Sequence, residues 1–229
     1  MPNQSLLATL FAATALCATS AQSQTARTFE GVMRFRGEVE HRTVEMIYMA
    51  KGSKVRQEFP IENRRFVMLL DHRSGEMTTL DDEHKSYIVR NLHDLSGDDG
   101  EMPKITRLAG AERILGHDCE HFLIESPDVD LKAEVCAAKG LGLFNGGSDM
   151  SWAPGNSASQ RALVAKNTEY ARILREGFLP LKFTTISEDG TRATMVATSV
   201  EAKQLDASVF MPPVGYTRVQ LPAGFGGRP

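Results

Sequence analysis

Three consecutive pieces of sequence decide the fold: Thr43-Val-Glu-Met-Ile-Tyr-Met-Ala-Lys51, Gly52-Ser53 and Lys54-Val-Arg-Gln-Glu-Phe59. The first piece alternates, so that Met46 and Tyr48 share one face while Ile47 and Met49 share the other. Apolar and aromatic side chains that alternate with a period of two and are followed by a Gly-Ser turn are typical of β-strands. The stretch therefore predicts two antiparallel strands joined by a tight turn.

The same pattern continues outward in both directions along the chain. We expect further strands at Phe29–Gly37, Arg65–Asp71, Glu76–Leu80, Lys85–Val89, Lys104–Leu115, Asp118–Glu125, Leu131–Ala137, Pro180–Ile186 and Thr191–Lys203. Arg65–Asp71 is apolar on both faces, which predicts a strand that is covered on both sides. Short strands that follow one another about every ten residues indicate a meander, in which each strand pairs with the next.

One segment has helical spacing instead. Apolar residues recur at intervals of three and four between Ala158 and Arg175, and Gly177 stands just beyond as a stop signal. We therefore expect a mainly β (α+β) fold: a single curved antiparallel sheet, half-barrel-like, with one main helix packed on its concave face.

The N-terminus has the outline of a secretory signal peptide. An apolar stretch from Leu6 to Ala18 is followed by small residues, and it is shorter than the 20 or so residues that span a bilayer. We expect a signal peptide at 1–21, a single β-rich domain at 22–216 and a flexible C-terminal tail at 217–229. Leu16 before Cys17 argues against lipidation, so the predicted location is periplasmic or secreted, without a transmembrane segment.

The composition argues against nucleic-acid binding, and the absence of known catalytic motifs argues against several enzyme classes. The net charge of −3 gives no broad basic surface for nucleic acid. The chain contains no G-x-S-x-G, H-E-x-x-H or C-x-x-C pattern and no glycine-rich phosphate loop. The sequence therefore predicts no catalytic residues, no enzyme activity and no cofactor.

Two cysteines, Cys119 and Cys136, remain after the signal peptide, and an even pair in an exported protein indicates one disulfide. If the strands around them form a hairpin with the cysteines directly opposed, Phe122 pairs with Ala133 and His121 with Glu134. This register gathers apolar residues on one face.

Two histidines lie beside the predicted bridge. His117, Cys119 and His121 alternate along one strand, so they point the same way, and two Cys with two His could bind zinc or copper. A disulfide with two surface histidines is the competing interpretation.

Strands that are apolar on both faces leave an interior that either packing or a ligand must fill. The concave face is predicted to carry the candidates for an apolar cavity, which are Phe35, Met46, Tyr48, Met68 and Leu70 from strands, with Tyr170 and Leu174 from the helix.

Several short motifs together resemble a known family. They include Phe29-Glu-Gly-Val-Met33, Ile114-Leu-Gly-His-Asp-Cys-Glu-His-Phe122, Leu179-Pro-Leu-Lys182 and Phe210-Met-Pro-Pro-Val-Gly-Tyr216. The chain resembles the exported bacterial family called domain of unknown function 4412, which has no established activity. The resemblance implies a fold similar to the half-barrel of periplasmic lipoprotein carriers of the LolA/LolB type, and a tryptophan in much of the family where this chain has Cys136.

The leading hypothesis is a non-enzymatic carrier or binding protein for an apolar ligand such as a lipid. A structural or adaptor protein that binds an envelope protein, through a sheet edge or the convex face, is the second. A metal-binding protein that uses His117 and His121 is the third, and an enzyme is the fourth.

Overall fold

The structure is a computed structural model that describes residues 28–39, 42–61, 64–91, 104–126, 131–142, 172–173, 176–186 and 190–220. Its strands are β1 Gly31–Val39, β2 Arg42–Lys51, β3 Lys54–Ile61, β4 Arg64–Asp71, β5 Glu76–Asp81, β6 Ser86–Asn91, β7 Lys104–Ile114, β8 His117–Ser126, β9 Leu131–Lys139, β10 Phe178–Ile186, β11 Arg192–Ala202 and β12 Thr217–Arg218. One 3-10 helix, η3, covers Ala207–Phe210.

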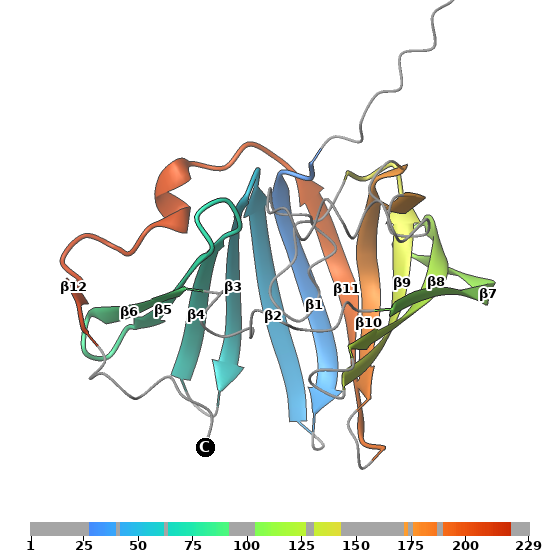
Figure 1. Ribbon diagram of the computed structural model, residues 1–229, viewed down its shortest axis with the longest axis horizontal. Helices are drawn as coiled ribbons and strands as arrows, with labels where there is room; N and C mark the ends of the chain where they lie inside the picture. The colour runs from blue at the N-terminus through green and yellow to red at the C-terminus, as the bar shows by residue number, and fades with distance from the viewer. Residues whose placement is uncertain are drawn as a thin grey trace, which may run out of the picture.

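All twelve strands belong to one open sheet, in the order β12-β6-β5-β4-β3-β2-β1-β11-β10-β9-β8-β7. Strands β1 to β6 form one antiparallel meander and β7 to β11 another, and the antiparallel pair β1–β11 joins them. Figure 1 shows the central strands nearly upright and those at both ends strongly inclined, as the right-handed twist of a large sheet requires.

The predicted fold class is wrong in its main helix. The described residues form one open sheet, and they include no main helix against either face. Most of 158–175 lies outside the described residues, as do Tyr170 and Leu174. The described part near its end is a helical turn: the Gly177 amide donates to the Ile173 carbonyl at 3.0 Å, and Ile173 is buried. A buried Ile173 followed by a stop signal at Gly177 is consistent with a single helical turn as well as with the end of a long helix. The sequence pattern therefore does not distinguish the two.

The sheet buries apolar side chains on both faces. One large cluster runs from Leu70 and Val55 in the first meander to Phe183, Val135 and Phe122 in the second. On the opposite face, Val67, Leu69 and Leu80 form a smaller cluster. Strand β4 contributes to both clusters, which confirms that this strand is covered on two sides.

The chain after β11 returns along the molecule to the far edge of the sheet (Figure 1). Arg56 donates to the Val209 carbonyl at 3.0 Å, and the Tyr216 hydroxyl donates to Asp82 at 2.7 Å. Strand β12 then pairs in parallel with β6. Two residues of the segment expected to be a flexible tail are therefore a strand, while the signal-peptide segment and 221–229 lie outside the described residues.

Candidate functional site

The five described candidates for an apolar cavity lie on one face of the sheet. Phe35 on β1 is the direct partner of Met46 on β2, and Gln57 on β3 is opposite both Tyr48 and Met68. Directly paired residues point to the same side, so β1, β2, β3 and β4 present these side chains together. Phe35, Tyr48 and Leu70 are almost completely buried, and Met46 and Met68 are half-buried against them.

Aromatic contacts extend this face into the second meander. The ring of Phe35 meets Tyr48 edge-on at 5.7 Å between centroids and Phe183 of β10 at 5.5 Å. Phe183 pairs with Val135 of β9, and Val135 pairs with Phe122 of β8. We call this continuous surface, from Leu70 to Phe122, the apolar face. Whether it also holds a ligand stays a prediction.

One polar side chain lies within the apolar face. Gln57 is only 7% exposed; its amide group donates to the Tyr48 hydroxyl, and its amide oxygen has no hydrogen-bond partner among the residues that the structure describes. A buried acceptor left unpaired costs about 1–3 kcal/mol. Gln57 was not among the residues predicted from the sequence, although its alternation with Val55 and Phe59 places it on this face.

Cys119 and Cys136 lie at disulfide distance, with 5.4 Å between their Cα atoms. The predicted register of their hairpin is wrong. Cys119 is opposite Ala138, and Cys136 is opposite His121, so the bridge is diagonal rather than directly opposed. Phe122 consequently pairs with Val135 instead of Ala133. Both cysteines are buried.

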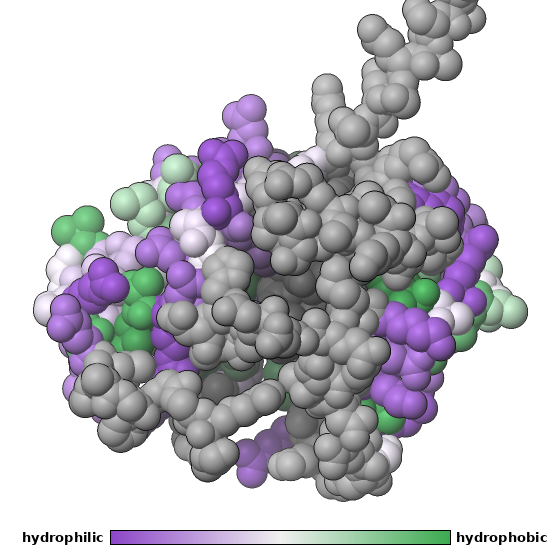
Figure 2. Space-filling model, viewed as in Figure 1, coloured by the Kyte–Doolittle hydropathy of each residue, from purple (hydrophilic) through white to green (hydrophobic). Residues whose placement is uncertain are grey.

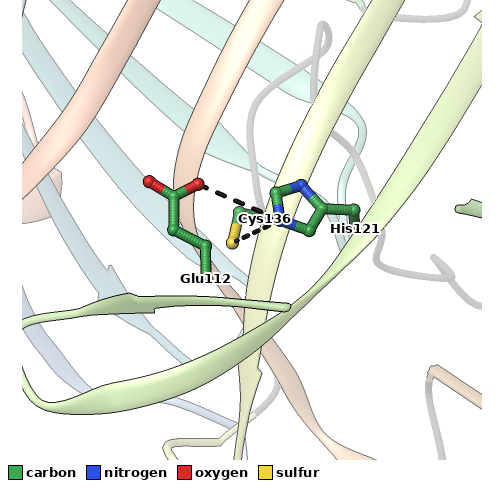
Figure 3. A group of neighbouring side chains, drawn as sticks. All are labelled: Glu112, His121 and Cys136. Carbon is green, nitrogen blue, oxygen red and sulfur yellow. Dashed lines mark hydrogen bonds and ion pairs between the residues drawn. The ribbon is translucent and has the colours of Figure 1, made fainter. Parts of the chain in front are cut away.

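A small polar cluster of Glu112, His121 and Cys136 adjoins the bridge (Figure 3). It lies on the side of β8 away from Phe122, because the neighbouring residues His121 and Phe122 point to opposite faces of the sheet. His121 Nε2 is 3.8 Å from Cys136 Sγ and 3.9 Å from a Glu112 carboxylate oxygen. The donor atoms of Glu112, His121 and Cys136 all lie within 4.8 Å of one another. His117, the other predicted metal ligand, is not part of this group, because it sits at the start of β8 opposite Ile114.

A charged cluster caps the other side of β8. Glu120 lies 2.8 Å from both Lys139 and Arg107, and 3.2 Å from Arg172. Burial raises the pKa of Glu120, but hydrogen bonds from Lys139 and Arg172 outweigh it, so the pKa is lowered overall. The Lys139 ammonium also lowers the pKa of Glu176.

This cluster is joined to the apolar face through aromatic rings. The guanidinium of Arg172 lies 5.8 Å from the centroid of Phe122 and 5.1 Å from that of Phe178. Cations over aromatic faces are attracted by the ring quadrupole. The charged cluster therefore marks the β8 end of the apolar face.

A separate open groove of about 960 Å³ lies at the outer end of the first meander. Its lining includes the apolar side chains of Phe66, Leu80 and Tyr87, and Arg65 paired with Asp82 at 2.7 Å stands among the charged residues. None of the five cavity candidates lines it. Across the described residues, no helix has the length and apolar character needed to cross a membrane.

The comparisons with known proteins give a matching family model and a solved structure of similar fold. A sequence model of the family described as a domain of unknown function (DUF4412) matches residues 29–216. An uncharacterized conserved protein from Thermus thermophilus is similar in structure, with a TM-score of 0.51 and 11% identity, over 82% of this chain and 88% of that chain.

A structure of PNGF-II in the C2 space group is also similar, with a TM-score of 0.45 and 14% identity, over 82% of this chain and 30% of that chain. No curated protein matches the chain. At 11% identity the likeness to the Thermus thermophilus protein concerns the fold alone.

Proposed function

Because the chain belongs to the family of the domain of unknown function DUF4412, which names no activity, we propose its function from the apolar face. The protein is a non-enzymatic binding or carrier protein for an apolar ligand such as a lipid, and it works in the periplasm after export. The observation that carries this proposal is the apolar face with the Gln57 amide oxygen buried within it, an acceptor that has no partner among the described residues.

The chemistry of that face suits an amphipathic ligand with a long apolar part. Each buried methylene contributes about 0.8 kcal/mol, so ten of them supply about 8 kcal/mol before the costs of association are subtracted. The Gln57 oxygen can accept a hydrogen bond from a hydroxyl or a protonated carboxyl group. Accepting it would remove the cost of the unpaired acceptor, which favours such a ligand over a plain hydrocarbon.

Displacement of a fluorescent fatty acid or phospholipid tests the proposal. We expect the protein to bind the probe and Leu70→Trp to weaken binding at least tenfold, because the larger ring occupies the apolar face. Leu69→Trp is the matched control, since Leu69 is similarly buried on the same strand but belongs to the opposite cluster. Failure of every apolar probe to bind, or equal effects of the two variants, would overturn the carrier function.

The adaptor hypothesis has one observation in its favour. The eleven-residue strand β7 stands at one edge of the sheet, and the described residues include no strand beyond it. An edge strand offers unpaired backbone groups to another chain. If no apolar probe binds, this edge becomes the leading candidate site, and it predicts that a proline at an outward-facing amide of β7 abolishes partner binding.

A further inference from the structure

Four potential metal ligands are gathered where β7, β8 and β9 lie side by side. Glu112 is the direct partner of Cys119, and His121 is the direct partner of Cys136. Cys119 and His121 are two residues apart on β8, so all four side chains point to one face of the sheet. This face is opposite to the one that carries Phe122, so the cluster is independent of the apolar face and of the proposed function.

We propose that reduction of the bridge between Cys119 and Cys136 opens a binding site for one divalent ion of the zinc class. The ligands are the two thiolates, His121 Nε2 and a carboxylate oxygen of Glu112. With the bridge intact, neither sulfur is a thiolate, so the site lacks two of its four ligands and binds such an ion far more weakly. The oxidation state of the bridge therefore controls metal binding.

The spacing of the ligand atoms fits a coordination tetrahedron. Zinc bonds of about 2.0–2.3 Å to N, O and S give tetrahedron edges of about 3.3–3.8 Å between ligand atoms. The distance from His121 Nε2 to Cys136 Sγ is 3.8 Å and that to Glu112 Oε2 is 3.9 Å, each within about half an ångström of such an edge. The two sulfurs, bonded at about 2.0 Å in the bridge, must separate by about 2 Å after reduction to reach their own edge. A set of two sulfurs, one imidazole and one carboxylate suits zinc better than calcium or magnesium.

The reaction balances with a thiol or phosphine as the reductant. Two electrons break the S–S bond, and each sulfur takes up one proton while the reductant is oxidised. The metal ion then displaces both thiol protons to water as it binds. His121 and Glu112 keep side-chain exposures of 28% and 37%, so an ion can enter from solvent.

One neighbour opposes metal binding. The Lys182 ammonium donates to both carboxylate oxygens of Glu112, at 2.9 and 3.1 Å. It competes with the ion for that carboxylate and places a positive charge beside the site. Lys182→Met should therefore tighten metal binding severalfold, a gain that a merely structural role for Lys182 does not predict.

The experiment measures zinc affinity of the full chain by competition with a chromophoric chelator, before and after reduction with a phosphine. We expect one zinc ion per reduced chain, at least 100-fold weaker binding to the oxidised chain, and at least a tenfold loss on His121→Ala. His117→Ala is the matched control, because His117 lies on the same strand outside the cluster, and it should leave the affinity unchanged.

Equal zinc affinity in the oxidised and reduced chains would overturn the proposal. Equal losses of zinc affinity in His121→Ala and His117→Ala would also overturn it. The same result is expected if reduction simply unfolds the chain. Cys119→Ser provides a second route without reductant: its free Cys136 thiol should bind zinc, and His121→Ala in that background should abolish the binding. Loss of zinc binding in these variants leaves fatty-acid displacement unaffected, so the two functions are tested separately.

Discussion

At the scale of single residues, the contact between Tyr48 and Gln57 is the least expected feature of the apolar face. An amide and a hydroxyl are buried together among methionine and phenylalanine side chains, and no described residue donates to the amide oxygen. Burying such a group without a hydrogen bond is unfavourable, so the pair adds specificity at a cost in stability. In the proposed function, a ligand removes part of that cost.

The two residues should therefore respond differently to apolar replacement. Tyr48→Phe leaves the Gln57 amide without its acceptor and should lower the free energy of unfolding by about 1–2 kcal/mol. Gln57→Met keeps a similar volume and removes the unpaired oxygen, so it should cost less than Tyr48→Phe, as should the double variant. Urea unfolding of the three variants measures this order, and a larger cost for Gln57→Met than for Tyr48→Phe would contradict it.

The turn between β7 and β8 offers a second test at this scale. Leu115 has φ = 51° and Gly116 has φ = 81°, and a two-residue turn with both values positive is the type that favours Asn-Gly. Leucine is strained in this conformation, and Leu115 is exposed, so its side chain contributes little packing. Leu115→Asn should raise the free energy of unfolding by about 1 kcal/mol. Leu115→Ala is the control, since it shortens the side chain but keeps the strain.

At the scale of elements, the β8–β9 hairpin shows what the sequence can and cannot predict. The alternation of Cys119, His121 and Phe122 correctly separates the two faces, and the bridge joins the predicted cysteines. The register differs by two residues, however, because Phe122 pairs with Val135 and not with Ala133. A slip of one residue exchanges the faces, but a slip of two preserves them, so the hydrophobic pattern cannot detect it.

The helix prediction failed because it too relied on a local pattern. Helical spacing before Gly177 depends only on neighbouring residues. The apolar surface that a helix could cover depends instead on how distant strands pair in the sheet. For Gln57, alternation along β3 predicts the face on which the side chain lies. It does not predict that the amide oxygen lacks a partner, because that depends on the surroundings in the folded chain. Patterns in the sequence identify faces, and the partners across a face come from the folded chain.

The charged cluster around Glu120 makes an element-scale prediction about pH. The pKa values of Glu120 and Glu176 are both lowered from 4.5 in the folded chain. The stability they contribute is therefore present above about pH 4.5 and is lost as the pH falls through their lower folded values. Removing Lys139, which donates to both, should make the loss of unfolding free energy between about pH 5 and pH 3 shallower.

Urea unfolding of Lys139→Met across that pH range measures the effect. Lys54→Met is the control for the change of net charge, since its ammonium is 4.0 Å from Asp71 and takes no part in this cluster. Identical pH profiles for the wild type and Lys139→Met would show that the Glu120 cluster does not control acid stability. A shallower profile in Lys54→Met as well would assign the effect to net charge.

At the scale of the whole molecule, the protein is one open sheet whose two faces carry different chemistry. One face carries Gln57 and the apolar face from Leu70 to Phe122. The other carries the small cluster around Leu69, the segment that leads to β12, and the bridge with Glu112 and His121, whose cysteines also pack within the large cluster. In Figure 2 the described surface at both ends is largely polar, with separate apolar patches. This division allows ligand binding and redox-dependent metal binding to occur in one chain without sharing a residue.

Native mass spectrometry of the protein, purified from the cells that produce it without added lipid, tests the carrier function most directly. We predict a population with an added mass of one lipid-sized molecule, which organic extraction removes and which Leu70→Trp reduces while Leu69→Trp does not. A single species at the mass of the bare polypeptide in the wild type, unchanged after incubation with fatty acid or phospholipid, would contradict the proposed function.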